Sequence, residues 1–253
     1  MTTATIASGL RVAGYRAKPT PVKEGLRISD VARRMWQPML AMGVMVIAAG
    51  IALGIVSAVS ANDYFGLAGG VIQSAPGNGG IVSDRAFYEA VSNGLLPPLL
   101  FLGLGFLLSG VTFLLATILG ALRDGGRDIQ RAVGGDSIDF VKPITGKLFP
   151  PVMMMGLMVL IGGLGVGIVV VVDQSSYWLH ASALVASGPR TAGLASDLST
   201  IQSLHAWLQP LDFLGMGLIL SGIVLALATI VKALRFQAGR VVQLAQGGEV
   251  AAS

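Results

Sequence analysis

Four long apolar stretches constrain the fold of this chain more than any other feature. They cover residues 38–60, 95–122, 149–172 and 210–234, and their central turns contain no Lys, Arg, Glu or His. Each stretch has at least the roughly 20 residues that an α-helix needs to cross a bilayer. Because backbone groups in lipid must be hydrogen-bonded internally, these stretches predict four transmembrane helices in an all-α integral membrane fold.

The composition supports this class of protein. Of the 253 residues, 53% are hydrophobic and 12% are charged, whereas soluble domains carry about 25% charged residues. The chain has no cysteine, which excludes thiol catalysis, disulfides and cysteine-ligated clusters. About 37 mostly polar residues precede the first apolar stretch, so we expect a retained helix there and not a cleaved signal peptide.

The basic residues predict the orientation in the membrane. Of the 17 Lys and Arg residues, seven precede the first stretch, five lie between the second and third, and three follow the fourth. Only Arg85 and Arg190 lie in the two other loops. The positive-inside rule therefore predicts a multi-pass protein of the cytoplasmic (inner) membrane with both termini in the cytoplasm. The net charge of +4 has the same origin, so we expect contact with lipid headgroups and no nucleic-acid partner.

The second half of the sequence repeats the first. FLGLGFLLSG at residues 101–110 recurs as FLGMGLILSG at residues 213–222. PMLAMGVMVIAAGIALGIV, from Pro38, aligns with PVMMMGLMVLIGGLGVGIV, from Pro151. The offset is 113 residues through the first span and the outer loop, and 112 after a one-residue deletion. We therefore expect a tandem, parallel duplication of a two-helix unit, with the halves related by a pseudo-two-fold axis along the membrane normal.

The repeat also predicts how the chain is divided. The expected parts are an N-terminal tail (1–32), a first repeat (33–123), a cytoplasmic connector (124–145), a second repeat (146–235) and a C-terminal tail (236–253). The outer loops then cover residues 61–94 and 173–209. A Ser-Asp pair at Ser83 and another at Ser196 predict one short N-capped helix in each outer loop. Mixed basic and apolar residues beside the spans predict interfacial cytoplasmic helices.

Recurring glycines predict faces where helices pack closely. In lipid the hydrophobic effect does not drive helices together, so small residues that permit close backbone approach become important. An alternative is that these glycines line a substrate path. The predicted packing residues are Gly43, Gly50, Gly54, Gly103 and Gly110 in the first half and Gly156, Gly163, Gly167, Gly215 and Gly222 in the second.

Four polar residues of the second half form a candidate metal site on the outer face. They are Asp173, His180, His205 and Asp212. Two imidazoles and two carboxylates could bind copper, iron or zinc, but their spacing fits no standard motif, and Pro210 is expected to interrupt a helix between the last two. The alternative interpretation places the histidines at the membrane interface and makes Asp212 the cap of the fourth span's outer end.

No catalytic signature is present elsewhere. The spans contain no ionisable pair for a proton relay and no mid-span histidine for haem, and no phosphate loop or nucleophile elbow occurs. We therefore expect a non-catalytic subunit or scaffold of a larger inner-membrane complex, such as a respiratory, photosynthetic or membrane-oxygenase complex. Its partners would be other integral membrane subunits and bound lipid, with no cofactor beyond the metal ion considered above. The alternatives are an oligomeric transporter or channel component, and an outward-facing metal-binding enzyme or assembly factor.

Overall fold

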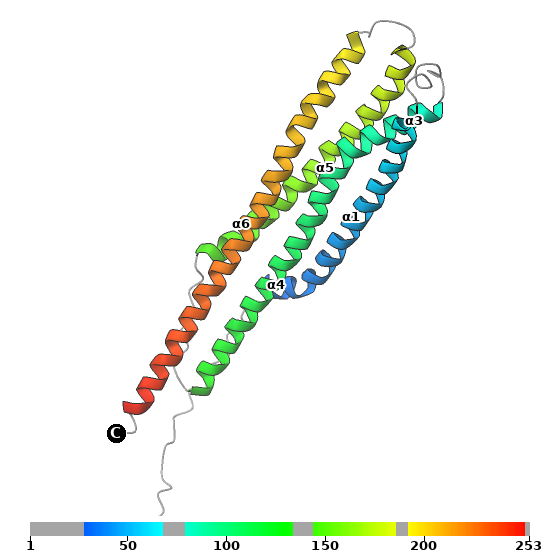
Figure 1. Cartoon of the computed structure of the whole chain (residues 1–253). Helices are drawn as coiled ribbons and strands as arrows, with labels where there is room; N and C mark the ends of the chain where they lie inside the picture. Colours follow the sequence, from blue (N-terminus) through cyan, green and yellow to red (C-terminus); the bar gives the residue numbers. More distant parts are fainter. Residues whose placement is uncertain (1–27, 68–78, 134–143, 186–191, 251–253) are drawn as a thin grey trace, which may run out of the picture.

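The described part of the chain is helical apart from a turn at Gly66 and Leu67. The computed structural model describes residues 28–67, 79–133, 144–185 and 192–250. Long helices run side by side along most of the molecule (Figure 1). The elements are α1 (Ile28–Phe65), α3 (Gly79–Glu89), the π-helical η1 (Ala90–Leu95), α4 (Leu96–Val133), α5 (Ile144–Val185) and α6 (Ala192–Val250).

The expected all-helical fold with four membrane-length apolar helices is confirmed. The four candidate spans are Val31–Phe65, Val82–Gly126, Ile144–Leu179 and Ser196–Gly239. Each is longer than the apolar stretch that predicted it, because polar residues on both sides continue the same helix. The interfacial segments expected on the cytoplasmic side are therefore the ends of α1, α4 and α6, and not separate helices.

The two helices expected in the outer loops differ from the prediction in the same way. The segment from Ser196 is the beginning of the 59-residue α6. The segment from Ser83 lies in α3, which continues through η1 into α4. Both serines lie four residues inside their helices, so neither is an N-cap.

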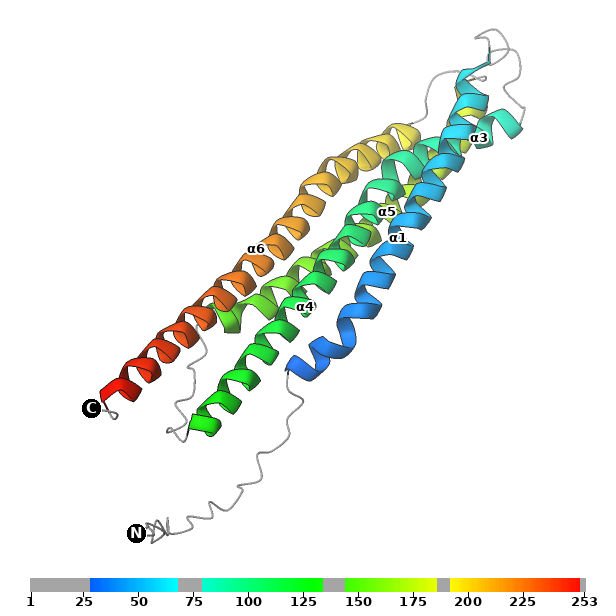
Figure 2. The same ribbon diagram turned by 60° about the horizontal axis from the view of Figure 1, so that its bottom comes forward.

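Proline residues interrupt these helices less than expected. α6 runs through Pro210 and α1 runs through Pro38. A proline removes one backbone hydrogen bond and displaces the carbonyl four residues earlier, which bends a helix without necessarily ending it. Figure 2 shows such a change of direction near the beginning of α1.

The helices pack in an open arrangement. α1 packs along α4, α5 packs along α6, and α4 also packs against α5 and α6. Among the described residues, α1 makes at most marginal contact with α5 and α6. Accordingly, α1 and α6 lie on opposite sides of α4 in both views (Figures 1 and 2). The molecule thus has two edge helices, each with one side unoccupied by the described chain.

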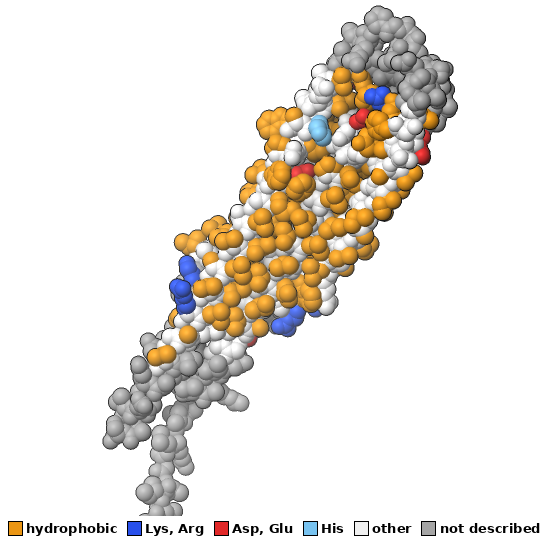
Figure 3. All heavy atoms as spheres, in the orientation of Figure 1, with side chains coloured by type: hydrophobic (Ala, Val, Ile, Leu, Met, Phe, Trp, Pro, Cys, Tyr) orange, Lys and Arg blue, Asp and Glu red, His pale blue; other side chains and the backbone are white. Residues whose placement is uncertain are grey.

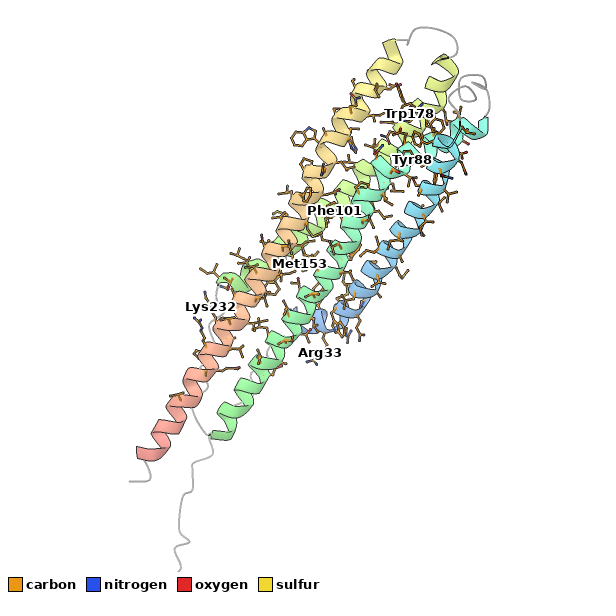
Figure 4. The ribbon with its side chains drawn as sticks, viewed as in Figure 1. Arg33, Tyr88, Phe101, Met153, Trp178 and Lys232 are labelled. Atoms are coloured by element: carbon orange, nitrogen blue, oxygen red, sulfur yellow. The ribbon has the colours of Figure 1, made fainter. Side chains whose placement is uncertain are left out.

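The two ends of the molecule differ in side-chain chemistry. Hydrophobic side chains cover most of the visible middle section, and most of the visible Lys and Arg lie toward one end (Figure 3). Figure 4 places Arg33 and Lys232 toward this basic end and Trp178 and Tyr88 toward the opposite, aromatic end. This distribution is typical of a membrane-spanning bundle with an aromatic interfacial belt.

All ten glycines predicted to pack helices lie against a neighbouring helix. A Cβ atom on Gly43 would lie 2.7 Å from Leu107 Cγ and 2.9 Å from the Gly103 carbonyl oxygen. A Cβ atom on Gly156 would lie 2.8 Å from both the Gly215 carbonyl oxygen and Ile219 Cγ1. No side chain fits at these distances, so the geometry supports the predicted packing role, which substitutions would test.

Candidate functional site

A buried carboxyl group lies between α5 and α6. Asp212 of α6 is 0% exposed. It faces Gly163 of α5, where a Cβ atom would lie only 2.7 Å from Asp212 Oδ1. The aligned pair in the first half is Gly50 and Leu100, in the same kind of contact: a Cβ atom on Gly50 would lie 2.8 Å from Leu100 Cδ2. The second half therefore has a carboxyl group where the first half has a leucine.

This carboxyl group has no hydrogen-bond partner in the described part of the chain. Both Asp212 oxygens are buried and unpartnered. Gly163, which it faces, is 16 residues from Lys147 and 15 from Trp178 along α5, or about 24 and 22 Å at about 1.5 Å per residue. Asp212 therefore lies deep in the apolar section. Since α6 begins at Ala192, Asp212 does not cap the outer end of a helix.

Apolar side chains surround the same position. Phe213 packs edge-on against Phe101 of α4, with ring centroids 5.4 Å apart, and Phe101 lies midway along the molecule (Figure 4). Leu211 also contacts the Gly163 position at 3.7 Å. An ionisable group inside a membrane protein is by default a functional-site hypothesis. A single carboxyl group can bind a proton, a cation or a hydrogen-bond donor from another helix.

The three members of the candidate metal site that the structure describes do not gather into one group. Asp173 is half-buried on α5, His205 is exposed on α6 and Asp212 is buried. α6 is continuous through Pro210, which places His205 and Asp212 about 10 Å apart along one helix. In the described ranges, no three His, Asp or Glu side chains gather into a metal-ligand group. His180 belongs to α5, but its side chain is outside the described residues, so the metal site stays a prediction.

A cation–π cluster joins three helices at the aromatic end. The guanidinium carbon of Arg85 on α3 lies 3.8 Å from the ring centroid of Trp178 on α5. Arg85 Nη1 also donates a hydrogen bond of 3.0 Å to the hydroxyl of Tyr64 on α1. The sequence interpretation used Arg85 only as evidence for orientation. A lone arginine in an aromatic-rich loop indicates a cation–π contact in general, but it does not identify the ring as that of Trp178.

The π-helical segment η1 is held between α1 and α5. The hydroxyl groups of Ser57 and Ser92 are hydrogen-bonded at 2.9 Å. On the other side, a Cβ atom on Gly167 would lie 2.5 Å from the Gly94 carbonyl oxygen. π turns are rare and frequently occur at functional sites. This one lies where the two halves of the molecule meet.

Among the described glycines with open space around them, three lie within the apolar sections of α5 and α6. A Cβ atom on Gly162 or Gly165 of α5, or on Gly217 of α6, would have no heavy atom within 4 Å. Glycine inside a helix is less favourable than alanine by about 0.5–1 kcal/mol. Packing against the described chain does not offset this cost at these three positions. They are therefore suited to close approach by a helix from another chain.

Comparison with protein families, with curated proteins and with solved structures found no match for this chain.

Proposed function

We propose that this chain is a non-catalytic scaffold subunit of a larger complex in the cytoplasmic membrane, and that α5 docks a neighbouring subunit. The observation that carries the proposal is the outward-facing pair Gly162 and Gly165, each with open space where a side chain would stand. Exposed Met158 and Ile161 flank this pair. Together they form a face with small residues at its centre and flexible apolar side chains beside it, which suits a partner helix.

We also propose that the subunit arose by tandem duplication of a two-helix unit. Aligned glycines make equivalent contacts in the two halves. Gly43 against Leu107 corresponds to Gly156 against Ile219, and Gly103 against Ile47 corresponds to Gly215 against Leu160. Because each unit contains two spans, both units have the same orientation in the membrane.

The proposed topology has both termini in the cytoplasm. Exposed Arg33 and Lys147 lie near the beginnings of α1 and α5, and exposed Lys232 lies in the C-terminal half of α6. The aromatic residues Tyr88 and Trp178 lie toward the opposite end (Figure 4). Basic residues favour the cytoplasmic side and aromatic residues favour an interface, so the aromatic end would face outward.

The scaffold proposal is tested by isolating the chain from its native membrane. Tagged wild-type protein, extracted in mild detergent, should carry other integral membrane proteins in stoichiometric amounts, identified by mass spectrometry. The double variant Gly162→Leu with Gly165→Leu should lose them, because two leucines would occupy the space for the partner helix. The same substitutions should leave the chain folded, since no atom of the described chain lies within 4 Å. Wild-type protein that carries no other membrane protein would overturn the proposal.

A role as a proton-handling transporter component is the second candidate, and the buried carboxyl group of Asp212 favours it. Wild-type protein in vesicles containing a pH-sensitive dye should then conduct protons faster than Asp212→Asn. Equal and negligible proton flux from both proteins would remove this candidate.

A further inference from the structure

We propose that copies of this chain associate head to tail in the membrane, with α6 of one copy packed against α1 and α4 of the next. The contact would reproduce the one that joins the two halves inside a single copy. The inference rests on the tandem duplication proposed above.

The contact between the two halves of one copy is the template contact, because the proposed contact between copies would have the same geometry. One face of α4 is buried against the second half. Leu102 clusters with Leu157, Leu160 and Ile219, and the position of Gly105 is in contact with Leu160. The buried residues of this α4 face are Leu102, Gly105, Ser109, Thr112, Ala116 and Leu119.

The aligned face of α6 is unoccupied. Its residues stand 112 positions later. Half-buried Ala228 apart, they are exposed: Leu214, Gly217, Ser221, Val224 and Val231. Gly217 has no heavy atom within 4 Å of a Cβ position. The hydroxyl of Ser221 donates a hydrogen bond within its own helix, to the Gly217 carbonyl oxygen at 2.7 Å. Gly217 and Ser221 of α6 thus match Gly105 and Ser109 of α4. They lack the packing that the second half provides around the α4 pair.

The first half carries the matching receiving surface. In the second half, the residues that cluster with α4 are buried or half-buried: Leu157, Leu160, Leu164, Ile219 and Ile223. The aligned residues of the first half are more exposed: Val44, Ile51 and Val111 are exposed, and Ile47 and Leu107 are half-buried. Each copy therefore has one surface of each kind, and both are apolar.

The open arrangement explains why both surfaces remain unoccupied. The pseudo-two-fold relation expected from the sequence would bury the aligned faces of α4 and α6 equally, and the described helices do not show it. Instead, α1 and α6 lie at opposite edges of the molecule (Figures 1 and 2). When the interface joins two different surfaces, each assembly keeps one unoccupied surface of each kind at its two ends. Further copies can therefore add until a ring closes or a filament extends. Lipid could cover the apolar side chains, but it does not account for a glycine at the centre of the α6 face.

Disulfide crosslinking tests the arrangement, and the absence of native cysteine makes it specific. The template pair of Gly105 and Leu160 corresponds to Gly217 in one copy and Ile47 in the next. Full-length Gly217→Cys and Ile47→Cys chains carrying different tags are co-expressed and oxidised in the membrane. We expect a disulfide-linked heterodimer, and a ladder of larger species when one chain carries both cysteines. Gly162→Cys paired with Ile47→Cys is the matched control and should not crosslink.

Two outcomes would overturn the inference. Self-crosslinking of Gly217→Cys alone would indicate a symmetric α6–α6 contact, and the absence of any crosslink would leave the α6 face to lipid. As a second measurement, Gly217→Leu should reduce recovery of a differently tagged copy by about tenfold or more. Gly162→Leu should retain self-association while losing foreign partners, so failure of the head-to-tail contact and failure of the scaffold proposal give different results.

Discussion

Substitution of Gly167 by alanine tests how closely η1 and α5 pack. A Cβ atom there would lie 2.5 Å from the Gly94 carbonyl oxygen and 2.8 Å from Pro98 Cγ. Neither neighbour can move on its own, because one is helix backbone and the other is a ring closed onto the backbone. To reach an ordinary contact of about 3.4 Å, the two helices must separate locally by roughly 0.9 Å.

The free-energy cost of this separation depends on how far α5 and η1 must move apart. A gap of about 0.5–1 Å loses about a quarter to a half of the dispersion energy of each atom pair across it. Overpacking in cores lowers stability by about 1–3 kcal/mol, and the rigidity of both neighbours places Gly167→Ala near the upper end, at about 2–3 kcal/mol. The hydrogen bond between Ser57 and Ser92, on the other side of η1, should be strained by the same movement.

Gly165→Ala is the matched control on the same helix. No heavy atom lies within 4 Å of its Cβ position, so this variant should equal the wild type or exceed it by up to about 1 kcal/mol through helix propensity. Unfolding in SDS, followed through the fluorescence of the three tryptophans, gives both free energies. Equal losses in the two variants, or no loss in Gly167→Ala, would refute the close contact.

Four further predictions concern single sites. Asp212→Leu introduces the residue found at the aligned position 100 of the first half. It should raise the free energy of unfolding by about 1–3 kcal/mol because it removes a buried polar group without a partner. A loss of stability would indicate an unrecognised partner. Arg85→Ala should lower it by about 1–2 kcal/mol by removing a cation–π contact and a hydrogen bond, and an unchanged value would show that this cluster does not stabilise the aromatic end. A fluorescent reporter fused after Ser253 should be active in the cytoplasm, and an active periplasmic reporter there would refute the topology. Purified wild-type protein should hold about one equivalent of metal if the outward-facing site exists, and His180→Ala with His205→Ala should remove it; less than about a tenth of an equivalent in the wild type would exclude the site.

The apolar spans were predictable because their signal is local. A run of apolar residues long enough to cross a bilayer specifies a helix without knowledge of its neighbours. Helix ends carried a weaker signal, since the polar residues from Ser196 onward continue the helix outside the apolar section. Pro210 was expected to break α6, yet the helix continues through it, because a proline removes only one backbone hydrogen bond.

The candidate site was less predictable because it depends on contacts between distant segments. From its position near the start of an apolar stretch, Asp212 resembled a helix cap. Its burial follows from the 20 helical residues that precede it in α6 and from the close approach of α5 at Gly163. Likewise, no local pattern shows that Arg85 lies over the ring of Trp178, which is 93 positions away in the sequence.

In the proposed duplication, the π turn of η1 accommodates one extra residue. Asp84 aligns with Asp197, and Pro98 aligns with Pro210, so the first half has one more residue over this stretch than the second. In η1 the Leu96 N–H donates to the Val91 carbonyl oxygen, five residues back, whereas α6 remains α-helical across the aligned stretch.

An insertion inside an α-helix ordinarily turns every later side chain by about 100° and disrupts its packing. Here the contacts on both sides of the insertion keep their register. On one side, Arg85 contacts Tyr64, and the aligned Leu198 packs against the cluster that contains the aligned Tyr177. On the other side, the glycines closer to the basic end make equivalent contacts in both halves. The wider turn therefore confines the insertion to η1, and the lengths of the two hairpins can differ by a residue while their helix faces stay matched.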